Sequence, residues 1–306
     1  MIDIFIPSYH RPDNLHTIAY LKKMQYDMSH VYVFIDDEAD DKEQYKATAD
    51  RNGFHLVVFD MTEARKRYDY VHRASVSRRS AGQARNMFQD YAKKIGIDQY
   101  LVMDDDTLMF QFRIKGISPW IAHPEVVKKT FEMVAQFVRK HQIGLFGLPQ
   151  SGDFYGQIKT NIYMRKVMNC TFYLLPYIYR GERGVQDDDT SMFVGVLNAG
   201  LFTGSLADGE ALYQQRSAKA KGGLTDLYNE CKLYNKAMVV PIQYPSCCWA
   251  ERQKMNGGRI HHHIDYRYLA PKLMKGERGN IAWDTYPEDW PFTNEPERAK
   301  SNGSND

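Results

Sequence analysis

The chain has 306 residues, enough for one large α/β domain or two small ones. Its residues are 43% hydrophobic and 25% charged, a composition that is ordinary for a globular protein. Its formal net charge of +2 provides no overall field that would favour nucleic acid or a membrane surface. No apolar run approaches the roughly 18 residues of a membrane span, and the first residues lack a basic segment followed by an apolar core, so we expect no signal peptide. The four cysteines form no Cys-x-x-Cys motif, so we expect a reduced, cytoplasmic protein.

Alternating strands and helices open the chain. Apolar runs at 2–6, 31–35 and 55–59 predict buried strands, and the segments 14–25 and 42–52 between them have helical spacing. Gly53 follows the second helix, where a C-cap is expected. Short links between such units predict a parallel, right-handed, doubly wound sheet.

An arginine-rich stretch, residues 61–79, interrupts this alternation and predicts either a solvated loop or a loop that meets an anion. A helix over 81–95 follows, with an apolar face that includes Phe88 and Tyr91. Arg85 and Asn86 lie in its first turns. An arginine beside a helix N-terminus suits a phosphate group.

Three adjacent carboxylates, Asp104, Asp105 and Asp106, follow the apolar run 100–103. Like charges this close repel each other unless a cation or hydrogen bonds compensate them, and oxygen-only ligands suit Mg²⁺ or Mn²⁺. Ligands of open α/β sheets bind at the carboxyl ends of the strands. The run therefore predicts a metal-assisted site, with a solvated acidic turn as the alternative. Residues i and i+2 of an extended segment point the same way, so Asp104 and Asp106 can share one ion while Asp105 faces elsewhere.

The second half of the chain predicts further elements with less regular spacing. We expect a linker over 110–120, a helix that opens at His123-Pro124-Glu125, a loop over 152–163, a helix over 224–234, a disordered tail over 294–306, and strands over 143–148, 169–175 and 238–242.

Two polar clusters stand out in this half. Gln186-Asp187-Asp188-Asp189 precedes a helix over 190–197, where acids either take part in chemistry or simply cap the helix. Residues 261–263 are three histidines after a Gly-Gly pair. If the segment is extended, His261 and His263 share a face and can ligate a metal or hold a phosphate.

Together these motifs resemble the GT-A glycosyltransferases, α/β proteins that bind a nucleotide-sugar. The matching segments are Ile4-Phe5-Ile6-Pro7-Ser8-Tyr9, Phe34-Ile35-Asp36-Asp37, Ala84-Arg85-Asn86 and, as the Asp-x-Asp metal motif, Met103-Asp104-Asp105-Asp106. Gln186-Asp187-Asp188 stands where inverting members carry a Glu-Asp pair that contains the catalytic base. More narrowly, Pro7-Ser8-x-x-Arg11-Pro12, Ala84-Arg85-Asn86 and Leu101-x-x-Asp104-Asp105-Asp106 resemble the TET/JBP-associated glycosyltransferases of phages, which are implicated in attaching sugars to hydroxymethylated pyrimidines in DNA.

The resemblance implies a GT-A fold, a doubly wound, mostly parallel sheet flanked by helices, in one domain over 1–293. Its donor half would span about 1–110 and its acceptor half 111–293. The implied activity is a hexosyl or pentosyl transfer that depends on Mn²⁺ or Mg²⁺. The sugar would move from a nucleotide-sugar, expected to be a UDP-sugar, to 5-hydroxymethylcytosine in double-stranded phage DNA in the infected host cytoplasm.

The resemblance also implies roles for single residues. Asp188, with Asp187 as the second choice, is the expected catalytic base. Asp104 and Asp106 are the expected metal ligands, and His261 or His263 would complete the metal or diphosphate site. The expected donor-binding residues are Pro7, Ser8, Tyr9, Arg11, Asp36, Arg78, Arg85, Asn86 and Asp105.

Three other functions share parts of this pattern. A glycosyltransferase acting on a polysaccharide or a lipid-linked saccharide would have the same donor site, although the sequence shows no membrane helix or amphipathic anchor, which slightly disfavours it. A metal-dependent phosphoryl-transfer enzyme would also use paired acids. A non-catalytic binding module could retain the fold alone, but the intact acid clusters argue against it.

Overall fold

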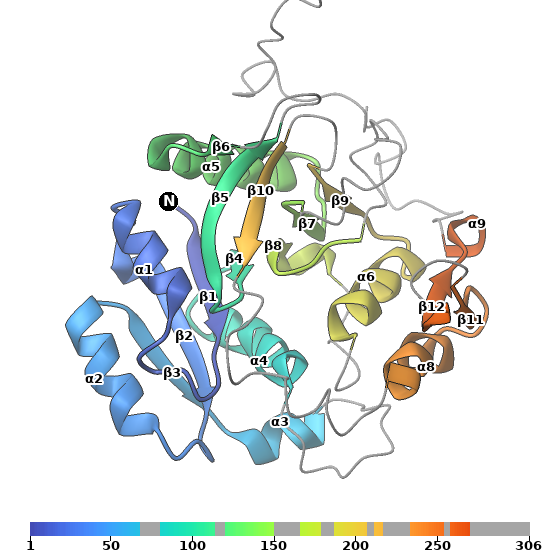
Figure 1. Cartoon of the computed structure of the whole chain (residues 1–306), viewed down its shortest axis with the longest axis horizontal. Coiled ribbons are helices and arrows are strands. Elements are labelled where there is room, and N and C mark those ends of the chain that lie inside the picture. The colour runs from blue at the N-terminus through green and yellow to red at the C-terminus, as the bar shows by residue number, and fades with distance from the viewer. Residues whose placement is uncertain are drawn as a thin grey trace, which may run out of the picture.

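A seven-stranded sheet forms the centre of the computed structural model, which describes residues 1–67, 80–113, 120–149, 166–178, 187–206, 211–216, 233–253 and 258–269 (Figure 1). Its strand order is β3-β2-β1-β4-β8-β7-β9. The bounds are β1 (Asp3–Pro7), β2 (Val31–Asp36), β3 (His55–Phe59), β4 (Gln99–Met103), β7 (Leu145–Gly147), β8 (Cys170–Leu174) and β9 (Thr203–Ser205). Only β8 runs antiparallel to its neighbours, β4 and β7. The predicted α/β fold with a mostly parallel sheet is confirmed.

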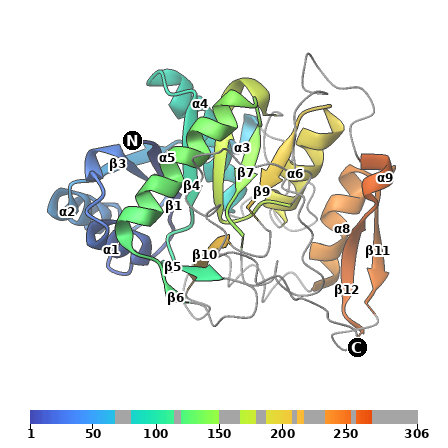
Figure 2. The same ribbon diagram turned by 90° about the horizontal axis from the view of Figure 1, so that it is seen from above.

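Helices cover both faces of this sheet (Figure 2). Their bounds are α1 (His16–Lys23), α2 (Lys42–Asn52), α3 (Met61–Arg67), α4 (Ala81–Lys94), α5 (Pro124–Lys140) and α6 (Asp188–Asn198), with short 3₁₀ helices at Met28–His30 and Leu175–Tyr177. Residues of α1, α2 and α5 pack into one core cluster, and residues of α3, α4 and α6 pack into another. Because β1 sends Ile4 and Ile6 into the first cluster and Phe5 into the second, its continuous apolar sequence is buried on both sides.

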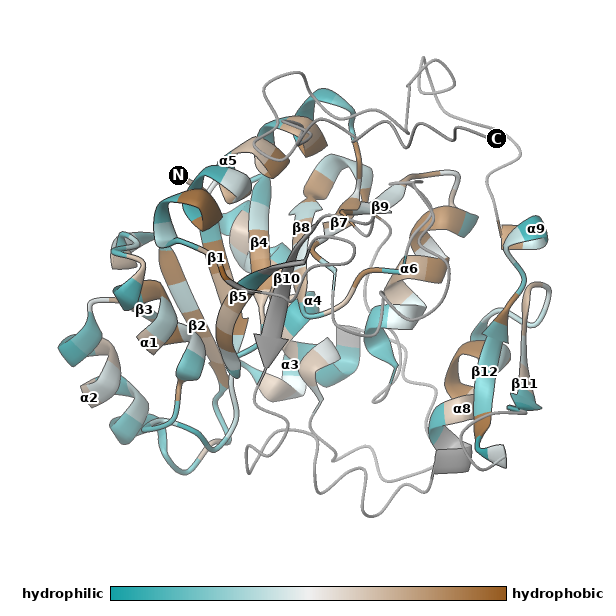
Figure 3. Cartoon of the chain, turned by 45° about the horizontal axis from the view of Figure 1, so that its top comes forward, coloured by the Kyte–Doolittle hydropathy of each residue, from teal (hydrophilic) through white to brown (hydrophobic). Residues whose placement is uncertain are grey.

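The packing of the central strands fixes the position of the polar residues that follow them. Strand β4 occupies the middle of the sheet between β1 and β8, and the ring of Tyr100 stacks between Phe5 at 4.6 Å and Tyr173 at 5.2 Å. Figure 3 shows the hydrophobic colour concentrated on these central strands, while α5 alternates between hydrophobic and hydrophilic along its length. Asp104, the first residue after β4, therefore lies at the edge formed by the strand ends, at the middle of the sheet.

The C-terminal described segments form a separate cluster against α6. They comprise α8 (Leu233–Gln243), an antiparallel hairpin of β11 (Cys248–Arg252) and β12 (Ile260–Ile264), and the short helix α9 (Tyr266–Leu269) (Figure 1). Phe193 and Leu197 of α6 pack with Val240, Cys248 and Leu269 of these segments. In the described part of the chain, no helix is both long enough and apolar enough to cross a bilayer.

Several predicted elements were wrong. Residues 61–67 form helix α3 instead of a loop, and the predicted linker contains parts of a second sheet of β10 (Ala211–Arg216), β5 (Thr107–Arg113) and β6 (Trp120–Ile121). The main partner of β5 is β10, which lies far along the chain, and such long-range pairing leaves no local signal. Residues 238–242 lie inside α8 instead of a strand, because a short apolar run has no periodicity that separates a buried helix from a strand. The predicted loop over 152–163, most of the predicted helix over 224–234 and the tail over 294–306 lie outside the described residues.

Candidate active site

The loop after β1 and the acidic run after β4 meet at the same edge of the sheet, because the two strands pair in parallel. The Ser8 hydroxyl donates a hydrogen bond of 2.7 Å to Asp105 Oδ2, and Arg11 Nη1 lies 2.5 Å from Asp105 Oδ1. Three predicted donor-binding residues are thus in direct contact. Pro7 ends β1 immediately before them.

Tyr45, which was not predicted as a site residue from the sequence, extends this contact into a network. Its hydroxyl lies 2.7 Å from Ser8 Oγ and accepts a hydrogen bond of 3.0 Å from the Arg11 backbone N–H. The residue is fully buried on α2. A tyrosine on the buried face of an amphipathic helix needs a hydrogen-bond partner for its hydroxyl. This requirement was the feature of the sequence from which a role for Tyr45 could have been predicted. The loop over residues 8–11 is therefore held both to α2 and to Asp105.

Burial sets the protonation behaviour of Asp105. Desolvation raises the pKa of its carboxyl to about 6, and the charges of Asp104 and Asp106 act in the same direction. The ion pair with Arg11 and the hydrogen bond from Ser8 oppose the shift. Asp105 is thus ionised and paired at neutral pH, and it holds the loop after β1 in place.

A buried arginine joins the two acidic runs. Arg85 Nη2 donates to Asp104 Oδ1 at 2.8 Å, and Arg85 Nη1 donates to Asp188 Oδ2 at 2.8 Å. The three side chains are 7%, 15% and 7% exposed. The predicted metal ligand after β4 and the predicted base at the start of α6 therefore belong to one site. Arg85 was predicted to hold a donor phosphate, but in the structure its guanidinium spans two carboxylates.

The start of α4 determines the position of Arg85. Ser80 and Gln83 form a capping box, in which the Ser80 backbone N–H donates to Gln83 Oε1 at 2.8 Å and Ser80 Oγ accepts from the Gln83 N–H at 3.4 Å. Arg85 follows within two turns on the face that packs against the sheet, next to the fully buried Asn86. The start of α4 thus directs the Arg85 guanidinium toward the C-terminal end of β4 and the N-terminal end of α6.

The second acidic run opens α6, with Asp187 as its N-cap residue. Asp187 Oδ1 lies 3.3 Å from Lys236 Nζ of α8, and Asp187 Oδ2 lies 3.0 Å from His262 Nδ1 of β12. Burial acts to raise the pKa of Asp187, but contact with His262 and the positive charges of Lys236 and Lys166 outweigh it, so the pKa lies below its usual value. Neither Lys236 nor His262 was predicted as a site residue from the sequence.

The neighbouring histidines differ from the prediction. Residues 260–264 are extended, as expected, but it is His262 that faces Asp187. His263 Nδ1 lies 3.1 Å from Glu251 Oε1, and its ring stacks on Trp249 at 4.3 Å. His261 Nδ1 lies 2.8 Å from the His262 carbonyl oxygen. Of the three histidines, His262 is therefore the one with a ring nitrogen in contact with Asp187, and the His261 ring lies 4.2 Å from the His262 ring.

The structure does not gather the predicted metal set of Asp104, Asp106, His261 and His263. Among the residues that the structure describes, the group of three potential ligands with atoms within 4.8 Å of one another is His10, Asp40 and Asp41, near the ends of β1 and β2. The residues around β4 nevertheless fit a cation by their chemistry. Asp104 and Asp106 offer oxygen ligands only, as a hard divalent ion requires.

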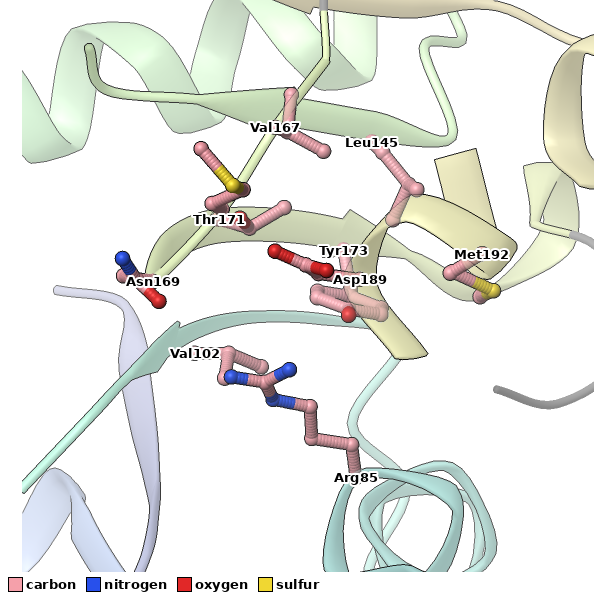
Figure 4. A pocket seen from close by; sticks show the side chains of 10 residues that line it. Arg85, Val102, Leu145, Val167, Asn169, Thr171, Tyr173, Asp189 and Met192 are labelled. Carbon is pink, nitrogen blue, oxygen red and sulfur yellow. The ribbon is translucent and has the colours of Figure 1, made fainter. Parts of the chain in front are cut away.

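A small pocket lies beside the Arg85 bridge (Figure 4). Arg85 reaches it from α4 and Asp189 from the start of α6, and its wall includes Asn169, Thr171 and Tyr173 from β8 and the residues before it. The Asp189 carboxylate also accepts a hydrogen bond of 2.7 Å from the Thr190 N–H. The pocket therefore gathers polar groups from two helices, one strand and the segment before that strand beside Arg85, which also contacts Asp188.

The other predicted donor-binding residues lie around the same edge or outside the described chain. Asp36 ends β2, is buried, and accepts a hydrogen bond of 3.1 Å from the Glu38 N–H. The Tyr9 ring lies 3.9 Å from the His10 ring in the loop after β1. Arg78 and Gln186 lie outside the described residues.

Comparison with known proteins gives one family and a set of remote structures. The family model described as TET-Associated Glycosyltransferase matches residues 2–223. Among solved structures, the chain is similar to glucosyl-3-phosphoglycerate synthase from Mycobacterium tuberculosis. The complex with Mg²⁺ and uridine-diphosphate has 10% identity, 86% of each chain covered and a TM-score of 0.46. The complex with Mn²⁺ and uridine-diphosphate-glucose gives the same three values. No curated protein sequence matches the chain.

Proposed function

Because the chain belongs to the TET-associated glycosyltransferase family, we propose that it moves a sugar from a nucleotide-sugar, a UDP-sugar, to the hydroxyl group of 5-hydroxymethylcytosine in double-stranded DNA. The observation that carries this proposal is the Arg85 bridge. It unites the acids after β4, suited to a donor diphosphate and its cation, with the acids that open α6, suited to an acceptor hydroxyl.

The donor would bind at the carboxyl ends of β1, β2 and β4, as ligands of open α/β sheets do. Pro7, Ser8, Tyr9 and Arg11 supply the loop at this edge, and Asp36 supplies a carboxylate at the end of β2. The network from Tyr45 through Ser8 to Asp105 would hold this loop ready for the nucleotide. A preordered loop supports binding because less conformational freedom is lost when the ligand arrives.

Asp104 and Asp106 would hold a divalent cation, Mn²⁺ or Mg²⁺. When bound, such a cation neutralises the negative charge that develops on the departing diphosphate. His261 and His263 stay predictions as further ligands. The pairing of His263 with Glu251 counts against that residue.

The acceptor hydroxyl needs a base, and Asp188 is the candidate, with Asp187 second. In a direct displacement, the hydroxyl oxygen forms a bond to the anomeric carbon of the sugar. The bond from that carbon to the phosphate oxygen breaks, and its electron pair leaves with the diphosphate. The proton of the hydroxyl passes to the Asp188 carboxylate. Arg85 would keep Asp188 ionised and aligned before the reaction, because its guanidinium favours the charged carboxylate.

The DNA acceptor rests on the family and on the geometry of DNA. The 5-hydroxymethyl group of cytosine projects into the major groove, so an enzyme can reach it in the duplex or after the base is flipped. The division into a donor half over 1–110 and an acceptor half over 111–293 likewise stays a prediction.

A transfer assay tests the proposal. The protein with Mn²⁺ is offered a panel of nucleotide-sugars and a DNA duplex that contains either 5-hydroxymethylcytosine or cytosine, and the digested nucleosides are weighed by mass spectrometry. We expect a gain of one hexose or pentose on 5-hydroxymethylcytosine only. Asp104→Ala should abolish the gain, whereas Asp98→Ala, which removes a half-exposed surface carboxylate paired with Arg139, should retain it.

Two results would separate the parts of the proposal. Metal-dependent hydrolysis of a nucleotide-sugar without modified DNA would retain the glycosyltransferase and exclude the DNA acceptor. Equal activity of Asp104→Ala and the wild-type protein would exclude the assignment of the site.

A further inference from the structure

Two basic side chains from the C-terminal segments contact Asp187, the first carboxylate of the acidic run at the start of α6. Lys236 belongs to α8 and His262 to β12, and both follow residue 223, where the family match ends. The side chains of Asp187, His262 and Lys236 are 5%, 6% and 22% exposed. These are buried contacts, which solvent screens far less than surface pairs.

Asp187 is an unusual N-cap residue. Its backbone is left-handed, with φ 54° and ψ 29°, whereas an N-cap residue typically has an extended backbone. An aspartate at an N-cap normally accepts a hydrogen bond from the backbone N–H groups of the first turn, but the Asp187 side chain makes no such bond. Its carboxylate turns instead to His262 and Lys236. The helix start thus gives up a stabilising cap for a contact with two distant residues.

The two partners are held by a packed core and do not reach Asp187 as free surface side chains. Phe193 and Leu197 of α6 pack with Val240 of α8 and Cys248 of β11. Since β12 pairs with β11 along its length, His262 comes from a strand that is fixed to the same core. The Ser191 hydroxyl also donates a hydrogen bond to Gln243 Oε1 and so ties α6 to the end of α8.

We propose that His262 and Lys236 are positioning residues that hold the Asp187 carboxylate and thereby aim the adjacent Asp188 at Arg85 and the acceptor hydroxyl. This inference rests on the proposed function, in which Asp188 is the base. Neither residue needs to touch the sugar or the cation. The segments beyond the family match therefore complete the active site that the matched part begins.

The variants His262→Asn and Lys236→Met test the role in the transfer assay. We expect each to lower kcat by about 10²-fold, as a small misplacement of a reacting group does, while KM for the nucleotide-sugar changes little. The matched control is His30→Asn. It removes a second histidine–aspartate pair, His30 Nδ1 to Asp3 Oδ1 at 2.9 Å, which lies at the opposite edge of the sheet near the start of β1. The control should retain wild-type kcat, and thermal unfolding of each variant checks that it folds.

Equal kcat values for His262→Asn and His30→Asn would overturn the inference. A loss of Mn²⁺ affinity in His262→Asn, measured by calorimetry, would also overturn it, because His262 would then be a metal ligand.

A spectroscopic measurement does not depend on transfer. With ¹⁵N-labelled histidine, the imidazole signals of His262 should shift in Asp187→Asn, while those of His30 should not. Unshifted His262 signals would overturn the pairing even if no acceptor were found. A wild-type protein that transfers no sugar but shows the shift would count against the proposed function and not against the contact.

Discussion

Replacement of Arg85 by methionine tests the central contact of the site. The Arg85 guanidinium donates at 2.8 Å to Asp104 and at 2.8 Å to Asp188, and all three side chains are largely buried. Methionine fills a similar volume without charge, so two carboxylates would lose their shared cation. Removing one member of a buried ion pair costs about 3–5 kcal/mol. Because two acids depend on Arg85, we expect a loss at the upper end of that range, a large part of a domain stability of about 5–15 kcal/mol.

Urea denaturation of the metal-free protein measures this loss, and Arg139→Met is the matched control. Arg139 also makes two bonds to a carboxylate, at 2.7 and 2.8 Å to Asp98, but the two side chains are 54% and 55% exposed. A solvent-exposed pair contributes about 0–1 kcal/mol. Adding Asp188→Asn to Arg85→Met should recover part of the stability, since one of the two carboxylate charges that faced Arg85 disappears. If Arg85→Met cost no more than Arg139→Met, the bridge would not be a buried ion pair and our reasoning would be refuted.

Three further predictions concern the site and the opposite edge of the sheet. In metal-free protein the pKa of Asp105 is about 6, whereas an unfolded aspartic acid titrates at about 4. Between these two pKa values the folded state binds more protons than the unfolded state, so the free energy of unfolding falls as the pH rises from about 4 to 6. Asp105→Asn should flatten this slope, measured by urea denaturation at a series of pH values from about 4 to 7. Tyr45→Phe removes a buried, hydrogen-bonded hydroxyl and should cost about 1–2 kcal/mol in urea denaturation, more than the control Tyr91→Phe in α4. Gly144→Ala would place a Cβ 1.9 Å from the Tyr177 carbonyl oxygen, so it should lower stability by about 1–3 kcal/mol, and an unchanged melting temperature would show that this contact relaxes freely.

Where local pattern and burial agree, the sequence predicts the fold well. The strands predicted at 2–6 and 31–35 and the helix predicted at 81–95 lie within one or two residues of their predicted bounds. In each of them, the spacing of the apolar residues fits one type of secondary structure. The helix that opens at Pro124 buries the stripe of Val127, Phe131, Val134 and Val138 as predicted. The strand predicted at 238–242 failed for the converse reason, since five apolar residues fit a buried helix equally well.

The sequence by itself determined which residue types form the site and that they lie at strand and helix ends. Asp104 to Asp106 and Asp187 to Asp188 were identifiable because carboxylates beside an apolar run need a compensating partner. Their actual partners were decided only by the tertiary structure. Arg85 joins acids that are 19 and 103 residues away, and His262 reaches Asp187 from a strand whose direction of pairing decides which of three adjacent histidines faces inward. Such contacts depend on how whole helices and strands pack against each other, and the spacing of residues along the chain does not predict them.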